Sequence, residues 1–239
     1  MMYGQLLSKR VRFTRAIKRL NPLVYYPLNE VGNSIAHNYA ISSIGDINGD
    51  VVGATLAQPG LVGRAYSFDG INDLITIPAN TIPSFSGKST IGFIVKVLET
   101  TASDKPVIDS QWGDNGGGGW QLIINNGNLT HCYVADATDR DDIAPEGGTF
   151  DLTDDFHFVV VTKNTTTGNQ KLYIDGVLNN TNSSLFFGTT QPDTNRKLQL
   201  ATNHPEDVFL NCLLQHVFII GDELTLSKIS ELSKIIGKS

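Results

Sequence analysis

Cysteine is scarce in this sequence, and so are the long apolar runs that would place a chain in a membrane. Only two of the 239 residues are cysteines, Cys132 and Cys212, and each lies within an apolar stretch. This setting favours buried, unpaired thiols, since free cysteine packs like a small hydrophobe, although one disulfide would also fit the count. Nothing approaches the run of about 18 apolar residues that spans a bilayer. The basic start lacks the apolar core and the cleavage site of a signal peptide, so neither a membrane segment nor a secretion signal is expected.

Motifs of enzymes and zinc centres are missing as well. The sequence has no Gly-x-Ser-x-Gly elbow, and no two Cys or His residues stand at zinc-ligand spacing. No glutamate has an acidic partner two or four positions along a predicted strand, whereas a retaining glycosidase needs two carboxyl groups about 5–5.5 Å apart. The glycine run Gly116–Gly119 lacks the Lys-Ser/Thr ending of a phosphate-binding loop. The sequence therefore predicts a protein that is not an enzyme and holds no cofactor, apart from the calcium candidate below.

Positive charge is nearly absent outside one segment. Six of the 18 basic residues and none of the 24 acidic residues lie in residues 1–20. The remainder therefore holds 12 basic against 24 acidic residues, a net charge of −12. Such an acidic body argues against nucleic-acid binding.

Short apolar strands and turn residues, in contrast, are abundant. The chain is 40% apolar, which is enough for a core, and its 23 glycines imply frequent turns. Phe156–Thr162 is an almost unbroken aromatic and β-branched run, typical of a strand that is covered on both faces. Asn126-Gly127 and Asp175-Gly176 supply the positive φ angles of tight hairpin turns. These patterns predict an all-β fold.

Two segments are predicted to be helical. Residues 226–236 carry an apolar stripe of Ile229, Leu232 and Ile236, with Thr225 or Ser227 as the cap. Residues 3–20 form an amphipathic helix with two faces. Its apolar face holds Leu6, Phe13, Ile17 and Leu20, and its basic face holds Arg12, Arg15, Lys18 and Arg19.

The basic helix fits three roles: packing on a partner subunit, lying on a membrane surface, or contacting nucleic acid. Its apolar face is narrow and has no Trp, which favours docking on a protein over a membrane. We therefore expect residues 1–20 to be a docking segment and residues 21–239 to be a separate domain.

Several strings in the chain resemble those of a known family and follow its order. They are NPLVYYPLNEVG (21–32), PGLVGRAYSFDGINDLITIP (59–78), GWQLII (119–124), FHFVVVTK with QKLYIDG (156–176) and GDELTLSKISEL (221–232). This set resembles the laminin-G-like, concanavalin A-like jelly-roll domain. The resemblance implies a two-sheet antiparallel jelly-roll sandwich, which with the two predicted helices completes the expected fold. Where the family usually has an acidic pair, this chain has Gln215-His216, so a metal or ligand role of that position is doubtful.

The basic segment followed by NPLVYYPLNE is also similar to the start of tailed-bacteriophage structural proteins. This resemblance implies a non-enzymatic decoration or tail-associated protein of the virion. Residues 1–20 would dock onto other virion proteins, in an oligomeric assembly, and the sandwich would face outward. The alternative is a carbohydrate-binding module that recognises glycans on the host surface.

Candidate ligand residues cluster around the glycine run. Sugars stack on aromatic rings while amides and carboxylates bind their hydroxyl groups. Trp112 is the stacking candidate, because Trp120 begins a strand and is expected to point into the core. The remaining candidate glycan-binding residues are Asp114, Asn115 and Tyr133, with Gln121 nearby.

A calcium site is a weaker expectation. Asp46, Asn48 and Asp50 imitate the start of a calcium-binding loop. However, the sixth position is Val51 where such loops have Gly, and the twelfth is Ala57 where they have Glu. A plain turn is therefore the favoured interpretation of this segment.

Overall fold

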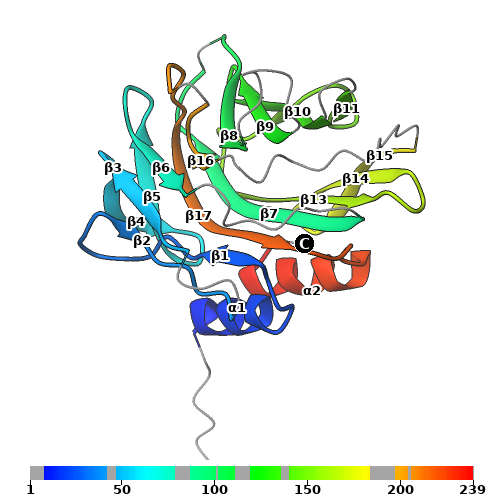
Figure 1. The fold of residues 1–239 in the computed structure, drawn as a ribbon, viewed down its shortest axis with the longest axis horizontal. Coiled ribbons are helices and arrows are strands. Elements are labelled where there is room, and N and C mark those ends of the chain that lie inside the picture. Colours follow the sequence, from blue (N-terminus) through cyan, green and yellow to red (C-terminus); the bar gives the residue numbers. More distant parts are fainter. Residues whose placement is uncertain are drawn as a thin grey trace, which may run out of the picture.

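The structure, a computed structural model, describes residues 8–41, 47–78, 87–100, 102–110, 119–135, 140–183, 197–203 and 206–238. For residues 119–120, 131–135 and 140–142 it describes the backbone alone. Two antiparallel sheets face each other (Figure 1). The predicted two-sheet sandwich with a short helix near each end is thus confirmed. No helix within the described ranges is long and apolar enough to cross a membrane.

The first sheet, sheet A, has the strand order β15-β14-β13-β7-β17-β5-β4, and β1 pairs with β17 at one end. Its strands are β1 (Val24–Tyr26), β4 (Thr55–Gly60), β5 (Gly63–Asp69), β7 (Lys88–Val97), β13 (His157–Asn164), β14 (Asn169–Ile174), β15 (Val177–Asn182) and β17 (Asn211–Ile220). The predicted strand after Phe156 corresponds to β13, which lies between β14 and β7 and is buried along its whole length. Its two-sided burial explains the unbroken apolar run.

The second sheet, sheet B, has the order β11-β10-β9-β8-β16-β6-β3-β2, and β12 pairs with β10. Its strands are β2 (Ile35–Ala36), β3 (Gly49–Val52), β6 (Leu74–Ile77), β8 (Lys105–Asp109), β9 (Gly119–Asn125), β10 (Asn128–Ala135), β11 (Arg140–Ile143), β12 (Phe150–Asp151) and β16 (Leu198–Leu200). Neighbours in this sheet come from distant parts of the chain, as β16 lies between β8 and β6.

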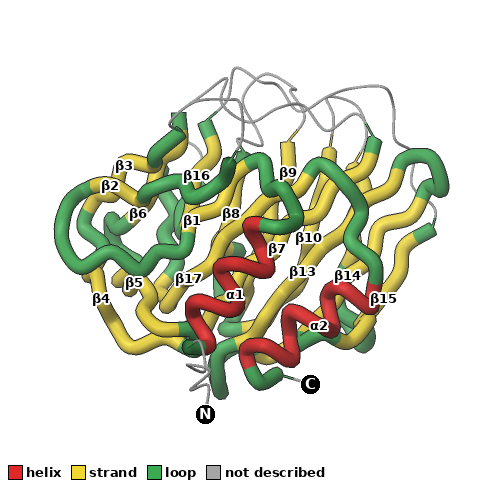
Figure 2. Tube along the Cα trace, turned by 90° about the horizontal axis from the view of Figure 1, so that it is seen from below, coloured by secondary structure: helices red, strands yellow, loops and turns green. Residues whose placement is uncertain are grey.

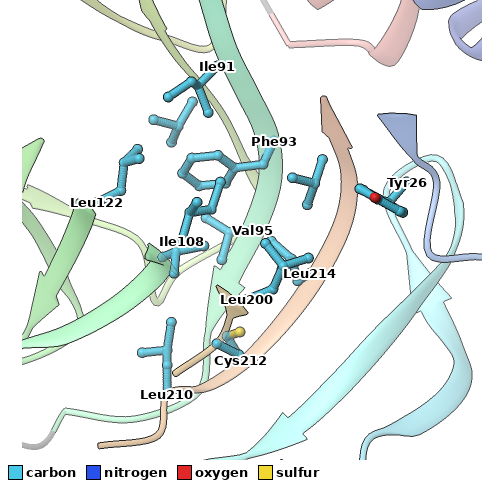
Figure 3. Close-up of a cluster of buried hydrophobic side chains, with 14 of the residues drawn as sticks. Tyr26, Ile91, Phe93, Val95, Ile108, Leu122, Leu200, Leu210, Cys212 and Leu214 are labelled. Atoms are coloured by element: carbon cyan, nitrogen blue, oxygen red, sulfur yellow. The ribbon is translucent and has the colours of Figure 1, made fainter. Parts of the chain in front are cut away.

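The main core fills the space between the sheets (Figure 3). Phe93 and Leu214 from sheet A meet Leu122 and Leu200 from sheet B, and all four are essentially fully buried. Burial of each such side chain contributes roughly 1.5–3 kcal/mol, so this layer supplies most of the driving force for folding. Cys212 is buried here as a free thiol, as its apolar setting predicts.

The tight turns follow the predicted chemistry. Asn126 and Gly127 have φ angles of 51° and 78°, and Asp175 and Gly176 have 51° and 84°. Two consecutive positive φ angles define the hairpin turn that matches the twist of the strands. A Cβ at position 176 would also lie 2.5 Å from the Cβ of Ser233, so only glycine lets this turn approach the second helix.

Helices α1 (Lys9–Lys18) and α2 (Leu226–Ile236) lie side by side on the outer face of sheet A (Figures 1 and 2). The predicted bounds and stripe of α2 are confirmed, and Thr225 caps it by accepting a hydrogen bond from the Lys228 amide. Lys9 Nζ donates to the Ile236 carbonyl at 2.8 Å, which ties the first helix to the end of the second. Together the helices cover the middle strands of this face of the sheet (Figure 2).

The apolar face of α1 packs on its own chain. Phe13 and Ile17 have no exposed surface, and the Phe13 ring lies edge-on to Phe158 of sheet A at 5.8 Å. This corrects the expectation that these two residues dock on a partner subunit, since side chains that are fully buried in their own chain have no surface for a partner to contact. Leu20 packs partly buried against the same cluster, and Leu6 lies outside the described residues.

Candidate functional site

A row of polar residues crosses five strands of sheet B. In the strand registers, Gln121 on β9 lies opposite Asp109 on β8, and Asp109 lies opposite Gln199 on β16. Gln199 in turn lies opposite Thr76 on β6, and Thr76 lies opposite Asp50 on β3. Directly opposed residues point to the same face of a sheet. We call these five residues the polar row.

The polar row faces away from the core. Leu122, Ile75 and Leu200 are each adjacent in sequence to one of its members, and all three belong to the core between the sheets. Because successive side chains of a strand alternate between faces, their polar neighbours point outward. The row therefore occupies the outer face of sheet B. The helices lie on the outer face of sheet A, on the other side of the sandwich.

Side chains of the row hydrogen-bond to one another even though several are deeply buried. Gln121 Nε2 donates to Asp109 Oδ2 at 2.8 Å, and Gln199 Nε2 donates to Glu206 Oε1 at 2.7 Å. Asp109 and Gln199 have no exposed surface, whereas Thr76 is half-buried and Asp50 is exposed. The row thus runs from a buried centre to an open end at β3.

One atom of the row lacks a partner. The side-chain oxygen Oε1 of Gln199 is buried and makes no hydrogen bond. An unsatisfied buried acceptor of this kind costs about 1–3 kcal/mol. Within the described residues, four other buried side-chain atoms also lack a partner, in Thr162, Gln170 and Gln215 on sheet A. A ligand hydroxyl or amide would satisfy Gln199 Oε1.

Glu206 reaches Gln199 from a loop that Asn203 organises. Asn203 Oδ1 accepts hydrogen bonds from the amides of Asp207 and Val208, at 3.2 and 2.9 Å, and its Nδ2 donates to Asp207 at 2.7 Å. Glu206 itself is exposed and has a φ angle of 75°. Glu206 therefore brings an accessible carboxylate to the buried centre of the row.

The comparison with family models assigns the fold to a superfamily. Residues 69–230 match the model of the Concanavalin A-like lectin/glucanases superfamily. The match covers more than half of the sequence and includes four of the five strands of the polar row. The chain belongs to this superfamily. None of the curated proteins matches the chain.

Solved structures similar to this member of the Concanavalin A-like superfamily include receptor-binding domains of botulinum neurotoxins. A serotype D binding domain aligns with a TM-score of 0.68 at 16% identity, over 91% of this chain and 52% of that one. A serotype D ligand-binding domain in complex with N-acetylneuraminic acid gives 0.68 at 18%, over 92% and 52%. A structure described by the dependence of type C toxin entry on two ganglioside molecules gives 0.68 at 16%, over 93% and 53%.

At these identities the likeness concerns the fold. The chain spans about half the length of the toxin chains that it matches. The neighbours are binding domains built on the same Concanavalin A-like sandwich, and the printed ligands belong to those proteins.

Of the residues predicted to bind glycan, one falls beside the polar row. The backbone of β10 places Tyr133 directly opposite Gln121 in the register. Trp112, Asp114 and Asn115 lie outside the described residues, so their roles stay predictions. Sequence reasoning named Gln121 but missed Asp109, Gln199 and Glu206. Their only sequence signal is a polar residue between or after apolar ones in short strands, as in Leu198-Gln199-Leu200.

The candidate calcium residues have no shared site among those described. Asn48 Oδ1 accepts a hydrogen bond from the Asn38 amide at 2.9 Å, so Asn48 organises the backbone as a turn residue would. Asp50 is exposed at the open end of the polar row, and Asp46 lies outside the described residues. Within those residues, no group of three or more His, Cys, Asp or Glu side chains is placed to hold a metal ion.

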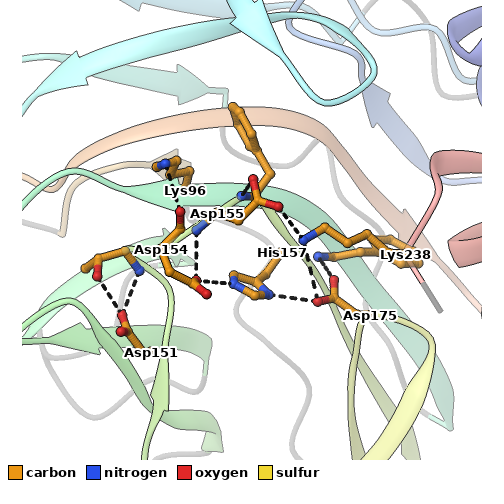
Figure 4. A network of polar contacts seen from close by, with 10 residues as sticks. Lys96, Asp151, Asp154, Asp155, His157, Asp175 and Lys238 are labelled. Atoms are coloured by element: carbon orange, nitrogen blue, oxygen red, sulfur yellow. Dashed lines mark hydrogen bonds and ion pairs between the residues drawn. The ribbon is translucent and has the colours of Figure 1, made fainter.

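A histidine-centred network at the start of β13 joins the C-terminal segment to sheet A (Figure 4). His157 Nδ1 lies 2.8 Å from Asp175 Oδ2, and its Nε2 lies 2.8 Å from Asp154 Oδ1. Lys238, just after α2, donates to Asp155 at 2.9 Å. Burial alone would lower the pKa of His157, but the hydrogen bonds to the two carboxylates outweigh burial and raise it.

This network is structural, because its acids act as turn and capping residues. Asp151 accepts from the Thr153 amide, Asp154 from the Asp155 amide, and Asp155 from the Phe156 amide, each at 2.7–2.8 Å. A cavity of about 350 Å³ lies beside it, lined in part by Asp175 and Asn179. Both carboxylate oxygens of Asp175 and the side-chain oxygen of Asn179 are already hydrogen-bonded. The polar row, with its unpartnered atom, is therefore the better candidate site.

The unusual pair Gln215-His216 joins β17 to neighbouring segments by hydrogen bonds. The register between β17 and β7 shifts after Gln215, and His216 has a φ angle of 54°. Gln215 Oε1 accepts from the Val62 amide at 2.9 Å, and His216 Nε2 lies 3.2 Å from the Val62 carbonyl. His216 Nδ1 lies 2.7 Å from Tyr25 Oη, and the ring stands edge-on to Phe13 at 4.9 Å. Both side chains are fully buried, so this position serves packing under α1.

Proposed function

We propose that the protein is a non-catalytic glycan-binding module whose polar row recognises sugar hydroxyl groups. The single observation that carries the proposal is the unpartnered Oε1 of Gln199, set in a row of amides and carboxylates on the outer face of sheet B. Amide and carboxylate groups are the side chains that bind sugar hydroxyls, and a ligand-binding site needs only a few of them at fixed positions. The superfamily, which includes lectins, supports the same class of ligand.

Ligand approach is from the open end of the row. At that end Asp50 is exposed and Thr76 is half-buried, Gln199 itself has no exposed surface, and the exposed Glu206 is bonded to its amide. A sugar hydroxyl can donate to Gln199 Oε1 while a second hydroxyl oxygen replaces Glu206 on Nε2. Such a bidentate contact satisfies both ends of one amide, which favours a diol over a single hydroxyl. Tyr133, next in the register, and Trp112 are the proposed aromatic contacts.

The test is a glycan array with the full chain, followed by titration calorimetry with the best ligand. Gln199→Met keeps the volume and removes both hydrogen-bonding atoms, so we expect binding to weaken at least about tenfold. Gln170→Met is the matched control, since Gln170 is also fully buried with unpartnered side-chain atoms but belongs to sheet A. We expect it to bind as the unaltered protein does.

Two results would contradict the proposal: no saturable binding on the array, or equal affinities of the Gln199→Met variant and the unaltered protein. Hydrolysis is tested in the same samples by measuring reducing ends released from polysaccharide. Release that disappears in Glu206→Gln would make the protein a glucanase, since a hydrolase needs a second carboxyl group near Asp109.

A structural role on a bacteriophage particle is the second candidate. It is favoured by Arg12 on α1 and Arg19 at its C-cap, which are exposed and form no ion pair within the described residues. An acidic neighbouring subunit would find a complementary surface there. Co-purification with virions that is lost in the Arg12→Gln/Arg19→Gln variant would support this role, and retention in that variant would remove the helix from it.

A further inference from the structure

A groove of about 330 Å³ lies between α1 and the segments that precede and follow β2. It is on the sheet A side of the molecule, and the polar row is on the other side. Its lining is mostly basic and polar: Arg10, Val11, Thr14, Arg15, Lys18, Asn29 and Tyr39.

The helix period brings the cations of the groove together. Arg10, Thr14 and Lys18 are spaced by four residues and form one row of α1, and Val11 and Arg15 form the adjacent row. None of the three cations forms an ion pair with any carboxylate among the described residues. The nearest acid in sequence, Glu30, is bonded to Tyr66 Oη at 2.7 Å and to two backbone amides. The groove therefore keeps its positive charge.

Packing holds two of these cations, Arg10 and Lys18, in position. Phe13 and Ile17 anchor the helix on sheet A, as described above. The Arg10 stem lies against Gly63, where a Cβ would be 2.9 Å from Arg10 Cδ. Lys18 Nζ stands 5.3 Å from the centre of the Tyr39 ring, a cation–π contact that holds the ammonium group over the groove. A site with preset cations loses little entropy when an anion binds.

We propose that this groove binds the carboxylate-bearing sugar of an acidic glycan. Guanidinium groups bind carboxylates through paired hydrogen bonds, and Arg10 and Arg15 can supply them. The side chains of Thr14 and Asn29 suit neighbouring hydroxyl groups, and the volume fits one or two sugar rings.

The same surface is a poor match for a membrane. The large apolar residues of α1 are buried against sheet A, so the helix has no apolar face to insert between lipids. A long polyanion such as nucleic acid would also meet the acidic remainder of the chain, with its net charge of −12. A short acidic sugar contacts the groove alone.

The experiment is titration calorimetry of the full chain with an oligosaccharide that contains glucuronic acid. Arg10→Gln/Arg15→Gln removes two charges inside the groove, and Arg12→Gln/Arg19→Gln removes two charges from the same helix outside it. We expect the first variant to lose affinity at least about tenfold and the second less than about twofold. Circular dichroism of each variant confirms that the sandwich is folded.

Comparison arms separate the sources of binding. Binding that persists in Gln199→Met and disappears in the Arg10/Arg15 variant belongs to the groove, whatever the outcome for the polar row. Equal losses in the two arginine variants would overturn the proposal, because they would show a general charge effect. Inorganic phosphate or phosphatidylserine vesicles that bind as tightly as the acidic sugar, through the same two arginines, would overturn it as well. So would the absence of any acidic-sugar binding.

Discussion

His157 and His216 are both buried, but their partners move their pKa values in opposite directions. His157 lies between two carboxylates, whose hydrogen bonds outweigh burial and raise its pKa. Burial dominates at His216 and lowers its pKa to about 4, opposed by the bond to Val62 and helped by the charge of Arg10. The Val62 carbonyl can only accept, so His216 Nε2 carries the proton and Nδ1 accepts from Tyr25. The pKa of one imidazole is thus raised and that of the other lowered.

For His157, the sign of the pKa shift predicts a stabilisation that is present in acid and lost in base. A raised folded-state pKa means that the folded state binds the proton more tightly than the unfolded state. The stabilisation is complete below the unfolded pKa of about 6.5 and disappears as pH rises through the folded-state value. We expect His157→Gln to lower the unfolding free energy by about 1.5–3 kcal/mol near pH 5, and by less near pH 9. Urea unfolding across this range measures the difference, and a gap that widens toward pH 9 would refute it.

For His216, the depressed pKa predicts the reverse dependence. Stabilisation by the neutral ring is present above about pH 6.5 and is lost as pH falls toward 4, because the unfolded state binds the proton first. The loss amounts to about 3 kcal/mol for a shift of this size. The His216→Asn variant tolerates the positive φ angle but should be less stable at pH 7, and its disadvantage should shrink toward pH 4. Parallel stability curves for variant and unaltered protein would contradict this account.

At the scale of elements, α1 is part of the sandwich. Phe13 contacts rings from two strands, Phe158 on β13 and His216 on β17, and has no exposed surface. We expect Phe13→Ala to lower the unfolding free energy by about 3–5 kcal/mol, since it leaves a cavity under the helix. The neighbouring Arg12→Ala is exposed and should change it by less than about 0.5 kcal/mol. Thermal unfolding of the two variants side by side is the measurement, and equal melting temperatures would show that α1 is dispensable.

The two helices show what periodicity can and cannot predict. The stripe of Ile229, Leu232 and Ile236 gave the bounds of α2, because a capped apolar stripe determines where a helix begins and which face it buries. The stripe of Phe13 and Ile17 was identified in the same way. Its partner was predicted wrongly, because an apolar face specifies burial and leaves open whether the covering surface belongs to the same chain.

The strands and turns were predictable for a local reason, and the polar row was not. Asp175-Gly176 specifies its turn within two residues, and the unbroken run after Phe156 specifies a covered strand. The row joins residues on β9, β8, β16, β6 and β3, whose order in space differs from their order in the chain. Gln199 is one polar residue in a three-residue strand. Its membership of a polar row becomes evident only from the strand register, which places it beside Asp109.

At the scale of the whole molecule, the two outer faces of the sandwich are unlike. Helices cover sheet A, and their basic surface carries the proposed acidic-sugar groove. Sheet B carries the polar row, which starts at an exposed aspartate and ends at a buried amide. The two proposed sites thus differ in charge and lie on opposite faces of one sandwich. A glycan with both neutral and acidic sugars would bind at two sites, the polar row and the groove beside α1.

The bond between Lys9 and Ile236 joins residues 227 positions apart, and it has a mechanical consequence. A pull that separates the two ends of this domain is borne first by the contact of α1 with α2. The strands of both sheets bear no load until that contact breaks, so the helix pair is expected to separate before the sheets unfold. Under tension, sheet B would keep its shape while the two helices separate.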